Sequence, residues 1–442
     1  MNLGRRLASQ SAVIFVARLL GAGLIFLVQA LIARFWGAQV LGEYLIIIAT
    51  VNLIAILVPL GFQTVATYFA SEYRAKGDRH QLIAFLTRAY GHVIFMFVLL
   101  LLAGPIVLEL IGQGEGTLSQ HFLPVCLLVF GTAMVSVNGT TLVGLKRPFA
   151  GFFADTVFRP MVVIGSFAIA ATLLNSGDAF DHMLWLIAIG FVIISLVHFG
   201  YVLATVPRVE NLVPKRIPEL PRWWRFAAPW VVIAMATDFF FDIDLLLLSH
   251  ALNHEELAIF GVCTRIFSLV SFGVAAVYAV TLPDIFESEA NSDREAFHRK
   301  VGEANMMASL ISLALFAIMV VAGPFALSLF GPSFTAGALP LAILCLALVV
   351  RSAFGPASIV LSIHDRPWSS LPAILLGMGT LVVGNWVLVP MFHLVGAALA
   401  AIIAITVWSG SLWLIALHTA HVDVSILQWF RTRRAARSAT AS

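Results

Sequence analysis

The sequence AGPIVLELIG runs from Ala103 to Gly112, and AGPFALSLFG runs from Ala322 to Gly331. Six of the ten positions are identical, at an offset of 219 residues (322 − 103). Further matches follow each copy in the same order, first a Leu-Pro pair and then an Arg-Pro-aromatic triplet: Leu123-Pro124 and Leu339-Pro340, then Arg147–Phe149 and Arg366–Trp368. An ordered series of matches at offsets of 216 to 219 residues is typical of an internal duplication. The two halves of the chain are therefore repeats of each other.

The composition around these repeats is that of a polytopic membrane protein. Apolar residues make up 60% of the 442 positions, and only 11% are charged, against roughly 25% in a soluble domain. A soluble chain of this length lacks the interior to bury so much apolar surface. Soluble enzymes, disordered proteins and secreted disulfide scaffolds are therefore excluded. The three cysteines lie in apolar runs, where small buried thiols are common and a disulfide or metal role is not expected.

A membrane-spanning helix needs about 20 mostly apolar residues, and twelve segments meet that requirement. They lie near 11–33, 44–70, 89–111, 122–145, 156–175, 183–206, 226–250, 258–282, 304–330, 338–362, 370–392 and 394–418. The first continues to Ile32, beyond the apolar core of a signal peptide, and contains Arg18. Pro59, Gly61, Pro229 and Pro356 inside spans predict kinks.

The predicted fold is an all-α polytopic membrane protein of 12 transmembrane helices in two parallel six-helix repeats around a central cavity. We expect an N-terminal lobe over residues 1–206, a cytoplasmic linker over 207–225, a C-terminal lobe over 226–418 and a tail over 419–442. Six spans in each half give parallel repeats, related by an axis along the membrane normal. Transport by rocking of two bundles about a midplane site suits that geometry, although duplication alone also explains the repeat.

The basic residues set the orientation. Of the 26 Lys and Arg residues, 22 lie at one set of span ends, and Arg34 alone lies at the opposite ends. Basic loops face the cytoplasm, so both termini are predicted to be cytoplasmic. The net charge of +3 is small and dispersed, which does not favour nucleic acid as a partner. In the tail, Trp429 and Phe430 precede four arginines, a pattern that predicts a helix lying on the anionic cytoplasmic leaflet.

Carboxylates inside the seventh span indicate a site. Charges in the bilayer are expensive unless they face water or a partner, and Asp238, Asp242 and Asp244 all fall in 226–250. Asp238 lies 12 residues into the span, about 18 Å deep, and Asp242 follows four residues later on the same helical face. A proton or a cation would offset their cost, while Asp242 and Asp244 are also compatible with a water-filled vestibule. Asn385 and Thr406 offer oxygen ligands for a small cation, although such groups more often bond across helices.

Three arginines also lie within spans: Arg18, Arg265 and Arg351. A guanidinium binds phosphate bidentately and stays charged at any depth, so arginines at different depths suit an anionic substrate that crosses the membrane. Alternatively, Arg18 extends to the interface, or each arginine pairs with a carboxylate such as Asp238.

The opening of the chain resembles that of bacterial polysaccharide-repeat-unit flippases. The residues that carry this resemblance are ARLLG at 17–21 and ARFWGAQVLGEY at 33–44. The second half begins similarly, with DIDLLL at 242–247 and LAIF at 257–260, followed by Arg265 and Pro283. The family belongs to the multidrug/oligosaccharidyl-lipid/polysaccharide exporter superfamily, and the resemblance extends over nearly the whole chain.

The resemblance implies two six-helix lobes around a cationic cavity and no enzymatic activity. The implied cargo is an undecaprenyl-pyrophosphate-linked oligosaccharide, moved from the cytoplasmic to the periplasmic leaflet of a bacterial inner membrane. It implies coupling to a proton or sodium gradient without a resident cofactor, with Arg18 in the cavity and Asp238 as the nearest counterpart of a sodium-site aspartate in lipid II flippases. Twelve spans rather than fourteen make lipid II itself a less favoured cargo. A polysaccharide polymerase and chain-length machinery are the implied protein partners.

Other classes of function fit less well. A major-facilitator transporter has twelve spans, but the loop at 74–81 lacks the flanking glycines of that family's motif. A drug exporter of the same superfamily is a closer alternative. A polysaccharide polymerase or ligase requires a large periplasmic loop, and the longest outward loop here is about ten residues, too short to form a domain.

Overall fold

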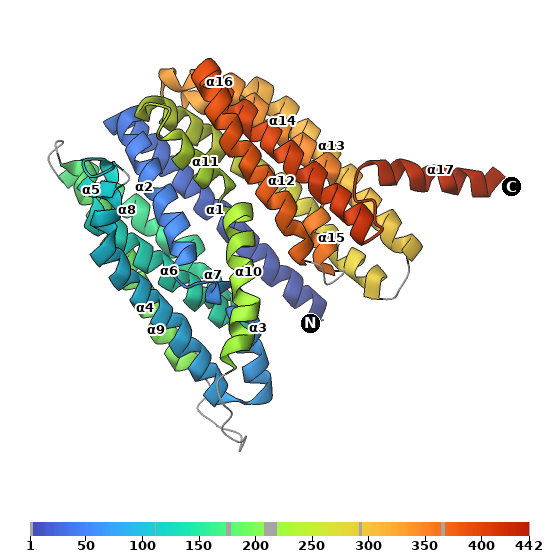
Figure 1. Ribbon diagram of the computed structural model, residues 1–442, viewed down its shortest axis with the longest axis horizontal. Helices are drawn as coiled ribbons and strands as arrows, with labels where there is room; N and C mark the ends of the chain where they lie inside the picture. The colour runs from blue at the N-terminus through green and yellow to red at the C-terminus, as the bar shows by residue number, and fades with distance from the viewer. Residues whose placement is uncertain are drawn as a thin grey trace. The chain divides into compact units, whose positions relative to one another are not determined.

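The computed structural model describes residues 3–110, 112–173, 178–206, 219–290, 294–363 and 367–441. Over these residues the chain is helical, without a strand (Figure 1). It divides into two units, Met1–Ile243 and Asp244–Ser442. Most of the expected linker, residues 207–218, lies outside the described residues. The helix that follows it packs on the second and third helices of the first unit, which is why the division falls later in the sequence than 207–225.

The first unit is built around one central helix. Its helices are α1 (Leu3–Trp36), α2 (Ala38–Leu57), α3 (Phe62–Lys76), α4 (Arg79–Leu110), α5 (Thr117–Gln120), α6 (Phe122–Gly144), α7 (Pro148–Phe153), a π-helical turn η1 (Ala154–Phe158), α8 (Arg159–Leu173), α9 (Ala179–Thr205) and α10 (Leu220–Asp238). α6 packs against α2, α3, α4 and α9. It is apolar on every side and largely buried, as expected of a helix enclosed by others.

The second span is broken, where the sequence predicted one continuous helix over 44–70. α2 ends at Leu57 and α3 begins at Phe62. Between them Leu60 and Gly61 have φ values of 51° and 83°, outside the helical region. A Cβ on Gly61 would lie 2.4 Å from the carbonyl oxygen of Ala227, so only glycine fits. The kink predicted from Pro59 and Gly61 is thus confirmed, as a complete break.

The second unit contains the remaining spans. α11 (Phe240–Leu248) crosses the division between the units, and then come α12 (His254–Ala290), α13 (Arg294–Ser328), a 3-10 turn η2 (Pro332–Gly337), α14 (Ala338–Phe354), α15 (Ala357–Ile363), a 3-10 turn η3 (Pro367–Ser370), α16 (Leu371–Thr419) and α17 (Leu427–Ala441). The expected tenth span, 338–362, is broken between α14 and α15, at the predicted Pro356.

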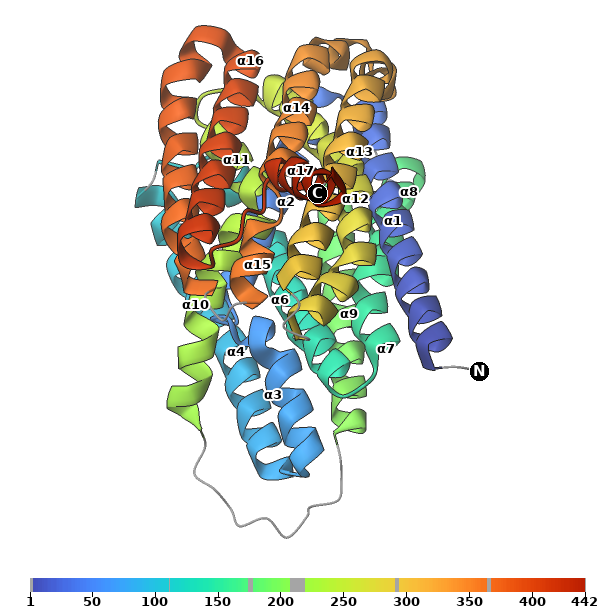
Figure 2. The ribbon, with the colours of Figure 1, turned by 90° about the vertical axis from the view of Figure 1, so that its right-hand side faces the viewer.

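α16 is a helical hairpin rather than one straight helix (Figure 2). His393 has φ 48° and ψ −125°, which interrupts the helix. On the two sides of this turn the backbones approach closely, so that a Cβ on Gly384 would lie 3.0 Å from the Cβ of Ala400. The two arms correspond to the predicted eleventh and twelfth spans.

Ten helices in the described part of the chain are long and apolar enough to cross a membrane. One of them covers both arms of α16, and the broken seventh span, α10 with α11, is not among the ten. With these two additions the helices account for the twelve expected crossings. The chain is a multi-pass membrane protein, and the predicted all-α fold of two six-helix repeats is confirmed. The central cavity and the cytoplasmic position of the termini stay predictions.

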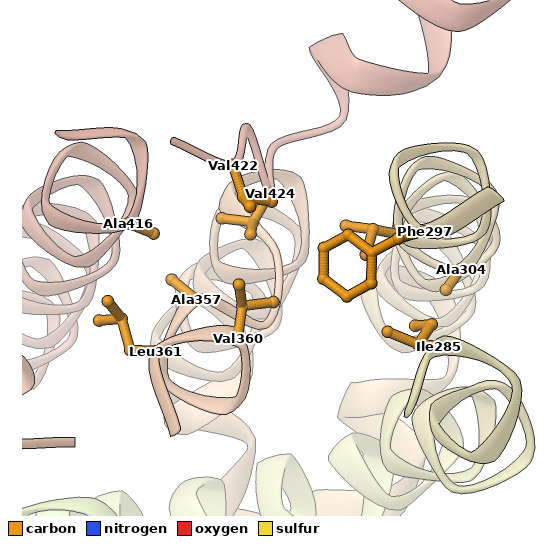
Figure 3. Packing of buried hydrophobic residues seen from close by; sticks show 10 residues of the cluster. Ile285, Phe297, Ala304, Ala357, Val360, Leu361, Ala416, Val422 and Val424 are labelled. Atoms are coloured by element: carbon orange, nitrogen blue, oxygen red, sulfur yellow. The ribbon is translucent and has the colours of Figure 1, made fainter. Parts of the chain in front are cut away.

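The C-terminal tail is built into the second unit. Val422 and Val424 are buried in a cluster with Ile285, Phe297 and residues of α13, α15 and α16 (Figure 3). α17 packs against α13, so the tail is held by protein contacts as well as by any contact with lipid.

Candidate cation site at the broken seventh span

The seventh span, predicted as one helix over 226–250, is interrupted at Phe239. α10 ends at Asp238, Phe239 has φ −118° and ψ 23°, and α11 starts at Phe240. The three aspartates of this span therefore surround a helix break instead of following one regular helix. Broken helices within a membrane are tolerated where they line a cavity or bind ions. Asp242 lies in the first turn of α11, where the helix dipole favours negative charge.

Asp244 and Asn385 form a buried pair within the second unit. Asp244 has an exposed fraction of 0%, and its Oδ1 accepts a hydrogen bond of 2.7 Å from Nδ2 of Asn385 on α16. The Oδ2 of Asp244 and the Oδ1 of Asn385 are also buried, and neither has a hydrogen-bond partner among the described residues. Two buried acceptor oxygens without a donor are costly, each by about 1–3 kcal/mol or more. A proton or a small cation bound at Oδ2 of Asp244 would reduce that cost.

Asp242 has a different partner, within the first unit. Asn52 of α2 donates a hydrogen bond of 3.2 Å from its Nδ2 to Oδ2 of Asp242, whose exposed fraction is 6%. Residues two apart in a helix lie about 200° apart around its axis. The Asp-Ile-Asp pattern therefore points the two carboxylates in opposite directions, and the structure pairs Asn385 with Asp244.

Asp238 is exposed, and its Oδ1 lies 3.3 Å from the hydroxyl of Thr237. The sequence placed Asp238 and Asp242 on one helical face because they are four residues apart. Residues four apart share a face only in an unbroken helix. The interruption at Phe239 means that Asp238 and Asp242 do not belong to one continuous helix.

Thr406 lies too far along the hairpin to join Asn385. Gly384 lies opposite Ala400, and Thr406 is six residues further along the second arm. Because the two arms are antiparallel, Thr406 lies level with residue 378 of the first arm. Residue 378 is seven residues before Asn385, which corresponds to about 10 Å along the helix axis. Its hydroxyl donates to the carbonyl of Ile402, at 2.7 Å, which is an ordinary bond within its own helix.

The three arginines lie on separate helices. The exposed Arg18 of α1 has its guanidinium 4.6 Å from the ring centroid of Phe152, a cation–π contact. Arg265 is half-buried on α12, and the exposed Arg351 lies in the last turn of α14. Phe152 lies two residues before the π-helical turn at 154–158. Such turns are frequent at functional sites, so the position of Arg18 is consistent with a role in binding.

A charged cluster that the sequence did not indicate ties α10 to α3. Arg222 bonds Glu72 through both guanidinium nitrogens, at 3.1 and 2.8 Å, and Glu219 at 2.6 Å. Burial alone would raise the pKa of Glu72, but the hydrogen bonds from Arg222 and Lys76 outweigh it, so the pKa is lowered. Nearby, Nε1 of Trp223 donates to the hydroxyl of Tyr73. These bonds attach the first half of the seventh span to the first unit.

Several solved structures of membrane transporters share this fold. An inward-facing multidrug resistance MATE family transporter of the MOP superfamily superposes with a TM-score of 0.73 at 14% identity, covering 98% of this chain and 99% of that one. The lipid II flippase MurJ, in an inward closed conformation, gives 0.72 at 12% identity, covering 95% and 90%. A MOP superfamily transporter from Pyrococcus furiosus, described as having a binding pocket of reverse polarity, gives 0.63 at 14% identity, covering 96% and 94%.

No protein-family model and no curated protein sequence matches the chain. The likeness to the solved structures lies in the fold, since at most 14% of residues are identical in these three. The chain therefore has the fold of the MOP superfamily, which confirms at the level of fold the resemblance that its sequence shows. The roles of the individual residues rest on the geometry described above.

Proposed function

We propose that this protein is a flippase that moves an undecaprenyl-pyrophosphate-linked oligosaccharide from the cytoplasmic to the periplasmic leaflet, driven by a proton or sodium gradient. The observation that carries the proposal is the buried Asp244–Asn385 pair, with two acceptor oxygens that lack donors, in a chain with a transporter fold. The polysaccharide polymerase and chain-length machinery are proposed partners.

Coupling follows from the chemistry of Asp244. An empty, ionised Asp244 leaves a buried negative charge with one hydrogen bond, which is an unstable arrangement. A proton or Na⁺ at Asp244 stabilises the conformation in which Asn385 and Asp244 are in contact. Release of that cation favours a second conformation of the protein. A ligand shifts an equilibrium only by its different affinities for the two states, and a buried carboxylate that binds the cation in one state provides that difference.

The arginines support an anionic cargo. A pyrophosphate carries negative charge that guanidinium groups bind bidentately. Arg18, whose side chain is exposed and lies over Phe152, is the strongest of the three candidates. Arg265 and Arg351 stay secondary candidates for the same role.

A cation-coupled drug exporter is the second candidate function. It is favoured by the likeness to the MATE family transporter, with a TM-score of 0.73 over 98% of the chain. The two functions differ in the charge of the cargo, because an exporter of cationic drugs gains nothing from arginines along its path.

The test compares the transport of two cargoes in proteoliposomes that contain the purified protein. One population carries a labelled undecaprenyl-pyrophosphate oligosaccharide, and the other a cationic dye. The flippase proposal predicts movement of the labelled lipid between leaflets under an ion gradient, with loss of that movement in Arg18→Ala. Transport of the dye alone, with equal rates in the wild type and Arg18→Ala, supports the exporter instead.

A further inference from the structure

The break in the tenth span leaves a backbone carbonyl that needs an external donor. In a continuous helix the carbonyl of Ala353 would accept from the amide of Ala357. Here the Ala357 amide donates to Gly355 instead, at 3.0 Å, and Pro356 has no amide hydrogen. Unsatisfied carbonyls are especially costly in a membrane protein, so the end of α14 requires a cap.

The C-terminal tail supplies this cap. The amide of Ile426 donates to the carbonyl of Ala353 at 2.9 Å. Asn305 of α13 joins the two segments, since its Nδ2 donates to the carbonyl of Val424 at 3.0 Å and, at 3.4 Å, to that of Ala353. A Cβ on Gly355 would lie 1.9 Å from the carbonyl oxygen of Val424. The tail therefore lies directly against the break.

Asp423 fixes the tail in this position. Its exposed fraction is 4%, and its Oδ1 accepts from Nε1 of Trp413 at 2.9 Å and from the amide and hydroxyl of Ser425 at 3.0 and 2.7 Å. Its Oδ2 forms an ion pair of 2.8 Å with Arg431 of α17. One buried carboxylate thus connects α16, the capping segment and α17.

The outer face of α17 combines basic and apolar side chains. Leu427, Phe430, Arg431 and Arg434 are exposed and follow the spacing of one helical stripe. On the inner side, the backbone of Trp429 lies against Gly302 of α13, about 3 Å from an ideal Cβ there. This contact fixes which face of α17 is turned outward. Arginines beside exposed Leu and Phe are typical of a helix that binds anionic lipid headgroups at a membrane surface.

We propose that the segment from Val422 to Arg434 is a lipid-sensing latch. Anionic phospholipid binds the outer stripe of α17 and keeps α17 docked on α13. Through the Arg431–Asp423 ion pair, docked α17 holds the capping segment on the broken tenth span. When the lipid surface carries no negative charge, the latch loosens and α15 opens more often. The proposal concerns the stability of α15 and does not depend on which cargo the protein moves.

Hydrogen exchange at the amides of α15 tests the latch in the full-length protein. The protein is reconstituted in vesicles of phosphatidylcholine alone and in vesicles that also contain phosphatidylglycerol. Wild-type protein is expected to exchange the α15 amides several-fold more slowly in the anionic vesicles. Equal exchange in both vesicles overturns the lipid-sensing proposal, and this comparison needs no variant.

Two variants separate the lipid contact from the cap. In Arg434→Gln, which removes an exposed arginine of the outer stripe and leaves the Arg431–Asp423 ion pair in place, the difference between the vesicles is expected to shrink, whereas the control Arg225→Gln, an exposed arginine of α10, keeps it. In Asp423→Asn, α15 is expected to exchange faster in both vesicles. Unchanged α15 exchange in Asp423→Asn overturns the latch, and an undiminished vesicle difference in Arg434→Gln overturns the assignment of the lipid contact to the outer stripe of α17.

Discussion

At the scale of single residues, the position of Asp244 shows why sequence spacing alone does not define the site. The sequence pointed to Asp238 and Asp242 through their four-residue spacing, and to Asn385 through its polarity within a span. In the structure Asn385 is buried and donates to the carboxylate of Asp244. The signal that would have found it is the two-residue spacing of Asp242 and Asp244, which turns one of them toward each side of the helix.

Asn385→Ala is expected to remove cation-dependent stabilisation. The substitution deletes the amide that donates to Oδ1 of Asp244 and one of the two acceptor oxygens, and a buried acceptor that loses its partner costs about 1–3 kcal/mol. Thermal unfolding in detergent, followed with and without added Na⁺ and at two pH values, measures the effect. Thr406→Ala is the matched control, since its hydroxyl bonds within its own helix. A cation response lost in Thr406→Ala but kept in Asn385→Ala would place the site at Thr406.

Arg18→Ala is expected to lower the surface polysaccharide of cells that depend on this protein. The substitution removes the guanidinium that lies over Phe152, whereas Arg18→Lys keeps a positive charge and should retain part of the export. Surface polysaccharide at matched protein levels is the measurement. Equal export from the wild type and Arg18→Ala would remove Arg18 from the substrate path.

At the scale of the element, the positions of the helix breaks could be predicted only in part from the sequence. Pro59, Gly61 and Pro356 correctly indicated interruptions in the second and tenth spans. The break at Phe239 has neither proline nor glycine beside it. The break separates α10 from α11, and α10 is attached to α3 by the hydrogen bonds between Arg222 and Glu72. Long-range contacts of this kind have no signature in the local sequence, whereas the lengths of the apolar runs predicted the spans directly.

Gly61→Ala is expected to destabilise the first unit, and Gly91→Ala is not. A methyl group on Gly61 would meet the carbonyl of Ala227 at 2.4 Å, and its φ of 83° disfavours any other residue, which together cost about 1–3 kcal/mol or more. Gly91 lies within α4, and apart from the backbone of its own helix no atom lies within 4 Å of its ideal Cβ, so alanine there favours the helix by about 1 kcal/mol. Unfolding midpoints of both variants test this contrast, and equal midpoints would show that the break tolerates a side chain.

The bond between α10 and α3 should weaken in acid. The pKa of Glu72 is lowered from its ordinary value of 4.5, so its ion pair with Arg222 stabilises the folded state above that value and is lost as the pH falls through the lower, folded pKa. Glu72→Gln is therefore expected to reduce the thermal midpoint at neutral pH, with a difference from the wild type that shrinks below pH 4.5. A difference that stays constant across this range would assign the effect to packing instead.

At the scale of the whole molecule, the two repeats share an architecture but differ in their interruptions. The first span is the continuous α1, while its counterpart, the seventh, is broken at Phe239. The second span is broken near Gly61, while its counterpart, the eighth, is the continuous α12. The duplication could be detected in the sequence because the two halves share the lengths of their apolar segments and several short motifs. The functional differences between the halves arise from single polar residues and breaks, which repeat analysis does not reveal.

The most direct measurement of the central claim is gradient-driven movement of the labelled lipid-linked oligosaccharide in proteoliposomes that contain the wild type or Asp244→Asn. The exposed Asp178 provides a matched control variant, Asp178→Asn. We predict that a proton or sodium gradient accelerates movement in the wild type and in Asp178→Asn, and has no effect in Asp244→Asn. An undiminished response to the gradient in Asp244→Asn would contradict the account, because the buried carboxylate would then take no part in coupling.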